Sequence, residues 1–219
     1  MISINNINKK FKRKTVLSNV SLEVNPGECV GIIGANGSGK TTLLSIICGI
    51  LKADSGDITI DGEKLNEMSF IGYVPQENPL IPELTAYDNL LLWHKGTKKD
   101  LKENLKSGIL HTLNIDDFYK KKVSSLSGGM KKRLSIGIAL MSNPKLLILD
   151  EPGASLDIKA KYEIRKYIEG FIKDKNGSVI ITSHDMYELE MCNKLYILKD
   201  SCLTQTNMSI DSESFINSI

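Results

Sequence analysis

A glycine-rich segment near the N-terminus has the residue types of a phosphate-binding loop. It reads Gly34-Ala35-Asn36-Gly37-Ser38-Gly39-Lys40-Thr41 and opens a helical pattern that contains Thr42. Glycines let the backbone curl so that N–H groups converge on phosphate oxygens, and a helix N-terminus adds positive potential. Lys40 can reach the β- and γ-phosphates, and the Thr41 hydroxyl can bind Mg²⁺. The segment therefore predicts a nucleotide site formed by Asn36, Gly37, Ser38, Gly39, Lys40, Thr41 and Thr42.

Two carboxylates and a histidine follow other apolar runs. Asp150 and Glu151 come directly after residues 146–149, and His184 closely follows residues 179–182. Consecutive residues at a strand end face opposite sides, so we expect Asp150 to bind Mg²⁺ through water and Glu151 to orient or deprotonate the attacking water. For the acidic pair alone, a solvated strand end would be the simpler interpretation. His184 can contact the γ-phosphate or hold the carboxylate, although a solitary histidine is more often structural.

Gln76 is a weaker candidate on spacing alone. It follows Tyr73-Val74-Pro75, another short run that ends in a proline. An amide can bind Mg²⁺ or the attacking water, but a surface glutamine after a proline is common. Its role stays open at the level of residue types.

The elements that must position these side chains alternate between strands and helices. Residues 29–33, 146–149 and 179–182 are apolar throughout, which is typical of strands covered on both faces in a parallel sheet. Helical patterns lie at 41–50 and 160–172. The chain is therefore predicted to be an α/β protein with a parallel core, and the candidate residues share the carboxyl edge of its sheet. The alternation in Ile58-Thr59-Ile60-Asp61-Gly62 predicts an antiparallel hairpin layer.

Residues 84–140 differ from the rest of the chain. Apolar residues recur there at helical spacing with lysines between them: Leu84, Tyr87, Leu90, Leu91, Leu101, Leu105, Leu110 and Leu113. The pattern predicts a mostly helical lobe inserted into an α/β body made of residues 1–83 and 141–219. We expect residues 1–219 to form a single domain with this insertion.

The composition excludes several classes of protein. The formal net charge is only +2, and 41% of the residues are hydrophobic, which disfavours a binder of nucleic acid driven by bulk charge and excludes a disordered chain. No run approaches the roughly 18 apolar residues of a membrane-spanning helix, and the N-terminus lacks a signal-peptide core. The four cysteines are scattered, which favours free thiols in a reducing cytoplasm.

A second anion cradle carries a resemblance to a known family. Leu126-Ser127-Gly128-Gly129-Met130 resembles the LSGGQ signature of ATP-binding cassette (ABC) ATPases and lies upstream of the Asp150 strand, as in that family. A chain that already holds phosphate in one loop has no obvious use for a second cradle. The resemblance implies head-to-tail dimers, in which Ser127, Gly128 and Gly129 of one copy cap the γ-phosphate bound by the other.

The remaining family motifs follow in order along the chain. Phe11 lies where the family has an aromatic residue that stacks on adenine, and Gln76 lies at the Q-loop position. Asp150-Glu151 resembles the Walker B strand end, and His184 resembles the switch histidine. The resemblance thus implies a P-loop ABC-type core with a mixed sheet, an antiparallel β layer and a helical subdomain that carries the signature. It assigns catalysis to Glu151, His184, Gln76 and Lys40, the metal to Thr41, Gln76 and Asp150, and ATP and Mg²⁺ as ligands.

Three residues depart from the family pattern. Phe11 replaces the commoner tyrosine, but stacking needs no hydroxyl. Met130 replaces the signature glutamine, a variant that resembles small exporter ATPases for drugs, peptides or polysaccharides. Ala154-Ser155 precede the D-loop pair Leu156-Asp157, where many members have a serine first. None of these changes touches the phosphate or water chemistry.

The expected function is the ATP-hydrolysing subunit of a transporter, with a slight preference for export. A separate transmembrane permease would dock a coupling helix beside Gln76 and hold the chain on the inner face of the cell membrane. A soluble ABC ATPase of translation or DNA repair is the alternative. Such proteins usually have two cassettes in one chain or a long coiled-coil insertion, and the segment between Gln76 and Leu126 has room for the helical lobe but for no such arm. A nucleotide sensor that barely hydrolyses ATP is disfavoured by Glu151 and His184. The basic run at 9–14 is interpreted as a solvated hairpin, with a lipid or nucleic-acid patch as the alternative.

Overall fold

Two sheets and a helical lobe make up the molecule in the computed structural model, which describes residues 1–64 and 70–206. The parts of the expected body at 65–69 and 207–219 lie outside the described residues. The smaller sheet is antiparallel in the order β2-β1-β4-β5. Its strands are β1 (Ile2–Phe11), β2 (Lys14–Val24), β4 (Ser55–Ile60) and β5 (Glu63–Lys64).

The larger sheet has the order β10-β9-β3-β8-β7-β6 and is parallel except for the antiparallel edge strand β10. Its strands are β3 (Cys29–Ile33), β6 (Ile71–Val74), β7 (Leu146–Asp150), β8 (Ser178–Thr182), β9 (Lys194–Lys199) and β10 (Cys202–Thr206). The three apolar runs of the sequence are the neighbouring strands β3, β8 and β7. The predicted α/β class with a parallel core and an antiparallel layer is confirmed.

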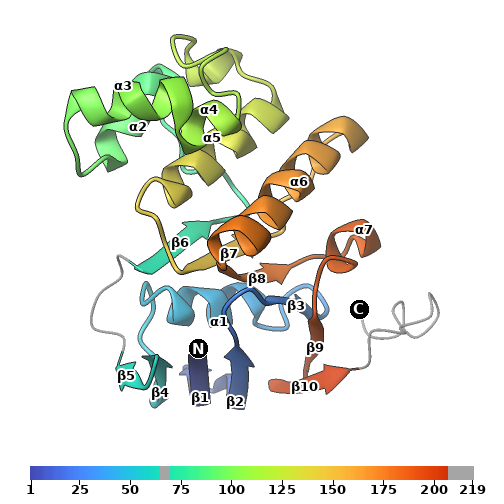
Figure 1. Cartoon of the computed structure of the whole chain (residues 1–219). Coiled ribbons are helices and arrows are strands. Elements are labelled where there is room, and N and C mark those ends of the chain that lie inside the picture. The colour runs from blue at the N-terminus through green and yellow to red at the C-terminus, as the bar shows by residue number, and fades with distance from the viewer. Residues whose placement is uncertain (65–69, 207–219) are drawn as a thin grey trace.

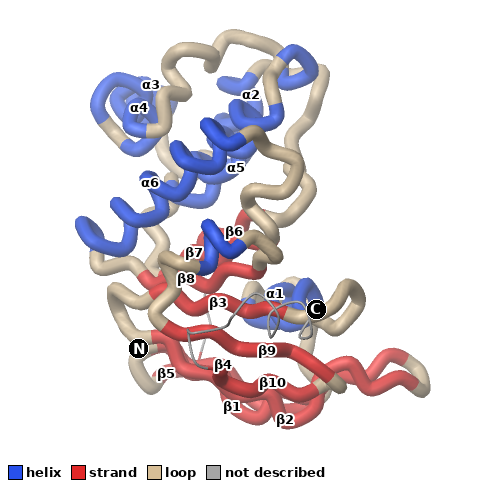
Figure 2. The backbone as a smooth tube through the Cα atoms, turned by 90° about the vertical axis from the view of Figure 1, so that its right-hand side faces the viewer, coloured by secondary structure: helices blue, strands red, loops and turns tan. Residues whose placement is uncertain are grey.

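The central strands are covered on both faces, which explains why they are apolar throughout. Leu146 and Ile148 face a core shared with helix α1 (Lys40–Ile47) and the antiparallel sheet. Leu147 and Leu149 face a second core shared with α6 (Ile158–Lys175) and the helical lobe. Figures 1 and 2 show α1 next to the strands of both sheets and α6 on the lobe side. Alternate side chains of the strand therefore pack into two different apolar cores, and neither face of the strand is exposed to solvent.

The helices between β6 and β7 form the lobe above the sheets in Figure 1. They are α2 (Ala86–Trp93), α3 (Lys98–Ser107), α4 (Ile109–Thr112), the 3₁₀ turn η2 (Val123–Ser125) and α5 (Gly128–Leu140), and the short α7 (Met186–Leu189) follows β8. Capping boxes start α2 at Thr85 and α3 at Thr97. Helix α1 is shorter than the predicted 41–50, because the chain turns after Cys48 through Gly49, whose φ is 63°.

The predicted hairpin at 58–62 is confirmed as the β4–β5 turn. Asp61 and Gly62 occupy the turn with φ values of 52° and 84°. Positive φ at two successive positions matches the right-handed twist of the flanking strands, and Asp-Gly tolerates it best. The turn also anchors the N-terminus, since the amino group of Met1 donates to Asp61 Oδ1 at 2.6 Å.

Candidate functional site

The phosphate-loop residues lie between β3 and α1, at the carboxyl edge of the large sheet. Gly37 and Gly39 have φ values of 78° and 111°, which side-chain-bearing residues rarely adopt. A Cβ atom on Gly39 would come within 2.9 Å of Val16 Cγ1 on β2. The Ser38 hydroxyl oxygen is shielded from solvent and has no hydrogen-bond partner within residues 1–64 and 70–206. A buried hydroxyl without a partner in a curled glycine loop fits an anion such as phosphate.

The side chain of Lys40 lies folded back on the loop that precedes it. It is only 7% exposed, and its Nζ donates to the carbonyls of Gly34 at 2.6 Å and Ala35 at 3.3 Å. Burial lowers the pKa of Lys40, and the nearby carboxylates of Glu151 and Asp150 partly oppose that shift. A phosphate bound in the loop would supply the full negative partner that this buried cation has only in part.

Asp150, at the end of β7, is held by two hydroxyl groups. Its Oδ1 accepts from Thr182 Oγ1 at 2.6 Å, and its Oδ2 accepts from Thr41 Oγ1 at 2.9 Å. Asp150 is 2% exposed and Thr182 is fully buried. Residue types alone do not single out Thr182, whose only signal in the sequence is a threonine at the end of an apolar strand. The contact depends on the pairing of β7 with β8, which the sequence does not reveal.

Glu151, His184 and Gln76 meet at the same edge of the sheet. Glu151 Oε1 lies 3.3 Å from His184 Nε2, and Glu151 Oε2 accepts from Gln76 Nε2 at 3.4 Å. Lys40 Nζ also lies 3.3 Å from His184 Nε2, so this one nitrogen faces both a cation and a carboxylate. A neutral Nε2 accepts from Lys40, whereas a protonated Nε2 donates to Glu151. His184 thus links the phosphate loop to the carboxylate.

The reason that Asp150 and Glu151 diverge differs from the one expected. Strand β7 ends at Asp150, so Glu151 is not a strand residue whose side chain alternates. Its φ of 45° is left-handed, and its backbone N–H donates to the carbonyl of Thr182 at 3.0 Å. The ladder therefore ends before Pro152, and a backbone turn directs the Glu151 side chain away from that of Asp150.

The predicted metal ligands are only partly assembled. Thr41 Oγ1 and Asp150 Oδ2 are adjacent, whereas the amide nitrogen of Gln76 is directed at Glu151. Within the described residues, no three His, Cys, Asp or Glu side chains form a metal cage. Nucleotide-bound Mg²⁺ takes few protein ligands and completes its shell with phosphate oxygens and water. One hydroxyl beside one carboxylate fits that pattern.

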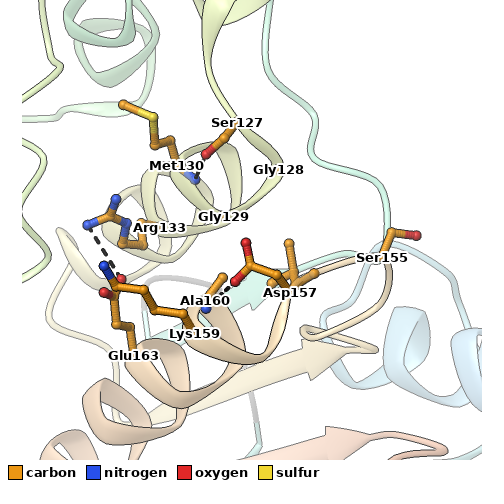
Figure 3. A pocket seen from close by; sticks show the side chains of 11 residues that line it. Ser127, Gly128, Gly129, Met130, Arg133, Ser155, Asp157, Lys159, Ala160 and Glu163 are labelled. Atoms are coloured by element: carbon orange, nitrogen blue, oxygen red, sulfur yellow. Dashed lines mark hydrogen bonds and ion pairs between the residues drawn. The ribbon is translucent and has the colours of Figure 1, made fainter.

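The signature residues line a different cavity from the phosphate loop. Ser127 caps α5, where its Oγ accepts from the Met130 N–H at 3.3 Å, and Gly128 and Gly129 begin the helix. These residues line a cavity of about 240 Å³ together with residues 155–157 and the start of α6 (Figure 3). None of residues 34–42 lines this cavity. The structure therefore does not bring Ser127 and its glycines together with Lys40 of the same chain.

Phe11 lies at the tip of the β1–β2 hairpin and is 46% exposed. The ammonium of Lys9 lies 5.5 Å from the centre of its ring. The contact of Val16 on β2 with Gly39 places this hairpin beside the phosphate loop. An exposed aromatic face next to a phosphate cradle is suited to stacking on a base.

Lys132 is a second residue of the site that residue types alone do not single out. Lys132 is 2% exposed and donates to the carbonyls of Pro75 at 3.2 Å and Gln76 at 3.1 Å. Burial lowers the pKa of Lys132, against the opposing effect of Glu188 and Asp150. The side chain ties the signature helix α5 to the segment that carries Gln76.

Comparison with known proteins identifies the family. The family model described as ABC transporter matches residues 17–154. This chain belongs to the ABC transporter family. It is 34% identical over 213 residues to the lipopolysaccharide export system ATP-binding protein LptB of Escherichia coli K12, covering 92% of this chain and 88% of LptB. It is 36% identical over 206 residues to the linearmycin resistance ATP-binding protein LnrL of Bacillus subtilis, covering 90% of this chain but only 66% of LnrL.

Solved structures of the family share the fold. The ATP-binding cassette MJ0796, in a dimeric post-hydrolysis state bound to ADP and Pi, superposes with a TM-score of 0.83 at 28% identity and covers 96% of this chain and 100% of that one. A nucleotide-free ATP-binding cassette from an ABC transporter gives a TM-score of 0.84 at 28% identity over 100% of this chain and 94% of that one. The chain is thus an ATP-binding cassette of the ABC transporter type. No helix in the described residues is both long and apolar enough to span a bilayer.

Proposed function

We propose that this cassette binds ATP with Mg²⁺ and hydrolyses it to drive transport through a separate membrane protein. The observation that supports hydrolysis best is the position of His184 Nε2, which lies 3.3 Å from both Lys40 Nζ and Glu151 Oε1. The cation that would hold the β- and γ-phosphates is thereby linked to the carboxylate suited to activate water. A protein that only binds nucleotide needs the first group but not the second.

Each residue has a role that follows from its contacts. Bound phosphates would draw the Lys40 ammonium away from the loop carbonyls and from His184. His184 Nε2 is then available to donate to the γ-phosphate or to Glu151, which accepts the proton of the attacking water. Thr41 and Asp150 would hold Mg²⁺, which neutralises phosphate charge, and Gln76 would join them on the side of the attacking water.

We further propose that the complete site forms between two copies of the chain. Ser127, Gly128 and Gly129 line a cavity that includes no phosphate-loop residue, and their N–H groups at the start of α5 are suited to hold an anion. A second copy placed head to tail would bring its phosphate loop to Ser127, Gly128 and Gly129 of the first copy. The adenine of the bound ATP would stack on Phe11. The relative MJ0796 is itself dimeric in its ADP- and Pi-bound form.

Transport is favoured over the alternative of a soluble factor for translation or repair. LptB is named for lipopolysaccharide export and LnrL for linearmycin resistance, and Met130 in the signature also favours export. The chain spans only 66% of the length of LnrL, so the activity of that longer protein is not assigned to this chain. We propose that residues 84–140 act as a helical subdomain on the body, that a permease docks beside Gln76, and that the cassette lies in the cytoplasm at the inner face of the membrane.

Nucleotide binding and turnover of purified variants test the proposed hydrolysis. Glu151→Gln should bind ATP as tightly as the parent but lose turnover by a factor of at least 100, because an amide cannot accept the proton of the attacking water. Lys40→Ala should lose ATP binding itself, since the cation for the phosphates is gone. Undiminished turnover by Glu151→Gln would contradict the assignment of the base.

A further inference from the structure

The single tryptophan of the sequence lies exposed at the end of α2. Trp93 and its neighbour Leu92 are each 58% exposed. The helix ends there in a short turn, in which His94 Nε2 lies 3.1 Å from the Thr97 carbonyl oxygen, and α3 begins at Lys98. A large aromatic and an aliphatic side chain exposed at the same helix end mark a contact surface for an apolar or interfacial environment.

A row of lysines begins directly after this apolar tip. Lys98, Lys102 and Lys106 recur every four residues and therefore share one face of α3, and the buried Leu101 and Leu105 form the apolar edge of that face. The three lysines line a cavity of about 880 Å³ together with Lys120. Within residues 1–64 and 70–206, none of these four ammonium groups has a carboxylate within 4.0 Å.

The two carboxylates that line this cavity, Asp88 and Asp116, are each held by a neighbour that also lines it. Asp88 accepts hydrogen bonds from the backbone and hydroxyl of Thr85 in the cap of α2. Asp116 Oδ2 lies 2.8 Å from His111 Nδ1. On α3 itself, Asp100 accepts from the Thr97 N–H at 2.7 Å in the cap. Four ammonium groups against these two carboxylates leave the lining with an excess of positive charge, and its first lysine, Lys98, follows the apolar tip by five residues.

We propose that Trp93, Leu92 and the lysine row of α3 form a docking surface for an anionic lipid membrane. Tryptophan and leucine enter the headgroup region of a bilayer, and lysines beside them bind lipid phosphates. Leu92 and Trp93 lie outside the cavity that the lysines line and are exposed at the end of α2, so they are free to enter a bilayer surface while the lysines meet its headgroups. The contact is made by this chain alone and requires neither nucleotide nor a permease, so it goes beyond the proposed function.

The unique tryptophan makes the test direct. The full chain without nucleotide is mixed with vesicles of phosphatidylcholine, with or without phosphatidylglycerol, and the emission of Trp93 is recorded. Vesicles that contain phosphatidylglycerol should shift the emission to shorter wavelength, and brominated acyl chains should quench it. Vesicles of phosphatidylcholine alone should leave the emission nearly unchanged. An emission that does not respond to anionic vesicles overturns the proposal and favours an acidic protein partner for the lysines.

Matched charge variants show which surface is responsible. Neutralising Lys98, Lys102 and Lys106 to Gln should weaken partitioning onto anionic vesicles by about a hundredfold, at about fivefold per lysine. The control neutralises Lys12, Arg13 and Lys14 to Gln, which removes the same charge from the exposed β1–β2 hairpin and should change partitioning by less than about fivefold in total. The α3 variant should keep the parent's circular dichroism spectrum. Equal loss in both variants, or loss in the hairpin variant alone, overturns the proposal.

Discussion

Replacing Thr182 by valine removes one hydroxyl from the centre of the site and leaves the shape of the side chain nearly unchanged. That hydroxyl donates to Asp150 Oδ1 at 2.6 Å and is fully buried, so water cannot take its place. A hydrogen bond to a charged group contributes about 1.5–3 kcal/mol to stability. Most of that stabilisation is lost when the buried carboxylate oxygen is left without its donor. We expect Thr182→Val to lower the free energy of unfolding by about 2 kcal/mol, which corresponds to about 4–8 °C in Tm at this chain length.

Urea unfolding without nucleotide measures this loss, and Thr182→Ser is the matched control. Serine keeps the hydroxyl and removes one buried methyl group, which costs about 1 kcal/mol. The valine variant should therefore be the less stable of the two. It should also turn over ATP more slowly, because Asp150 keeps only the hydrogen bond from Thr41. A valine variant at least as stable as the serine variant would refute the view that Thr182 stabilises the ionised carboxylate.

Three further changes have distinct expected outcomes. Burial raises the pKa of Glu188, and the hydroxyl of Ser183 partly opposes the shift. The folded chain thus binds this proton more tightly than the unfolded chain, and stability falls as pH rises from about 4.5 through the raised value. Glu188→Gln has no such proton to lose, so its free energy of unfolding should improve relative to that of the parent between pH 4 and pH 7.5, as measured by urea unfolding. A difference between the two proteins that stays constant with pH would contradict the raised pKa of Glu188. Lys132→Met should lower kcat for ATP more than it raises KM, because the carbonyl of Gln76 loses its donor; an unchanged kcat would refute this role. Leu147→Ala should cost about 2–5 kcal/mol in urea unfolding, whereas Ile158→Ala, at a side chain 87% exposed, should cost less than about 0.5. Similar losses in the two would refute the two-layer core.

The strands and the phosphate loop could be predicted because their signals are local. Runs such as 146–149 are apolar throughout only where both faces of a strand are covered, and the two cores on either side of β7 show this. The glycines and Lys40 of the loop belong to one continuous segment. The Asp61-Gly62 turn likewise depends only on the φ values of two adjacent residues.

Contacts that depend on the order of strands could not be predicted. Thr182 meets Asp150 only because β8 pairs with β7, and nothing in either segment specifies its neighbour. The burial of Lys132 follows from how α5 packs against the segment after β6, which the residue types of Lys131, Lys132 and Arg133 do not reveal. The left-handed turn at Glu151 was missed for a related reason: the backbone is held by Thr182 on the neighbouring strand.

The most direct test of the composite site is the mass of Glu151→Gln in saturating ATP and Mg²⁺, measured by analytical ultracentrifugation. A site shared between the phosphate loop of one copy and the signature of another predicts a dimer with ATP and a monomer without it. Adding Ser127→Arg to this variant should abolish the dimer and leave ATP binding to the loop intact, because it blocks only the cradle at the start of α5. If Glu151→Gln stayed monomeric with ATP bound, or dimerised equally well with Ser127→Arg, the composite site would be contradicted.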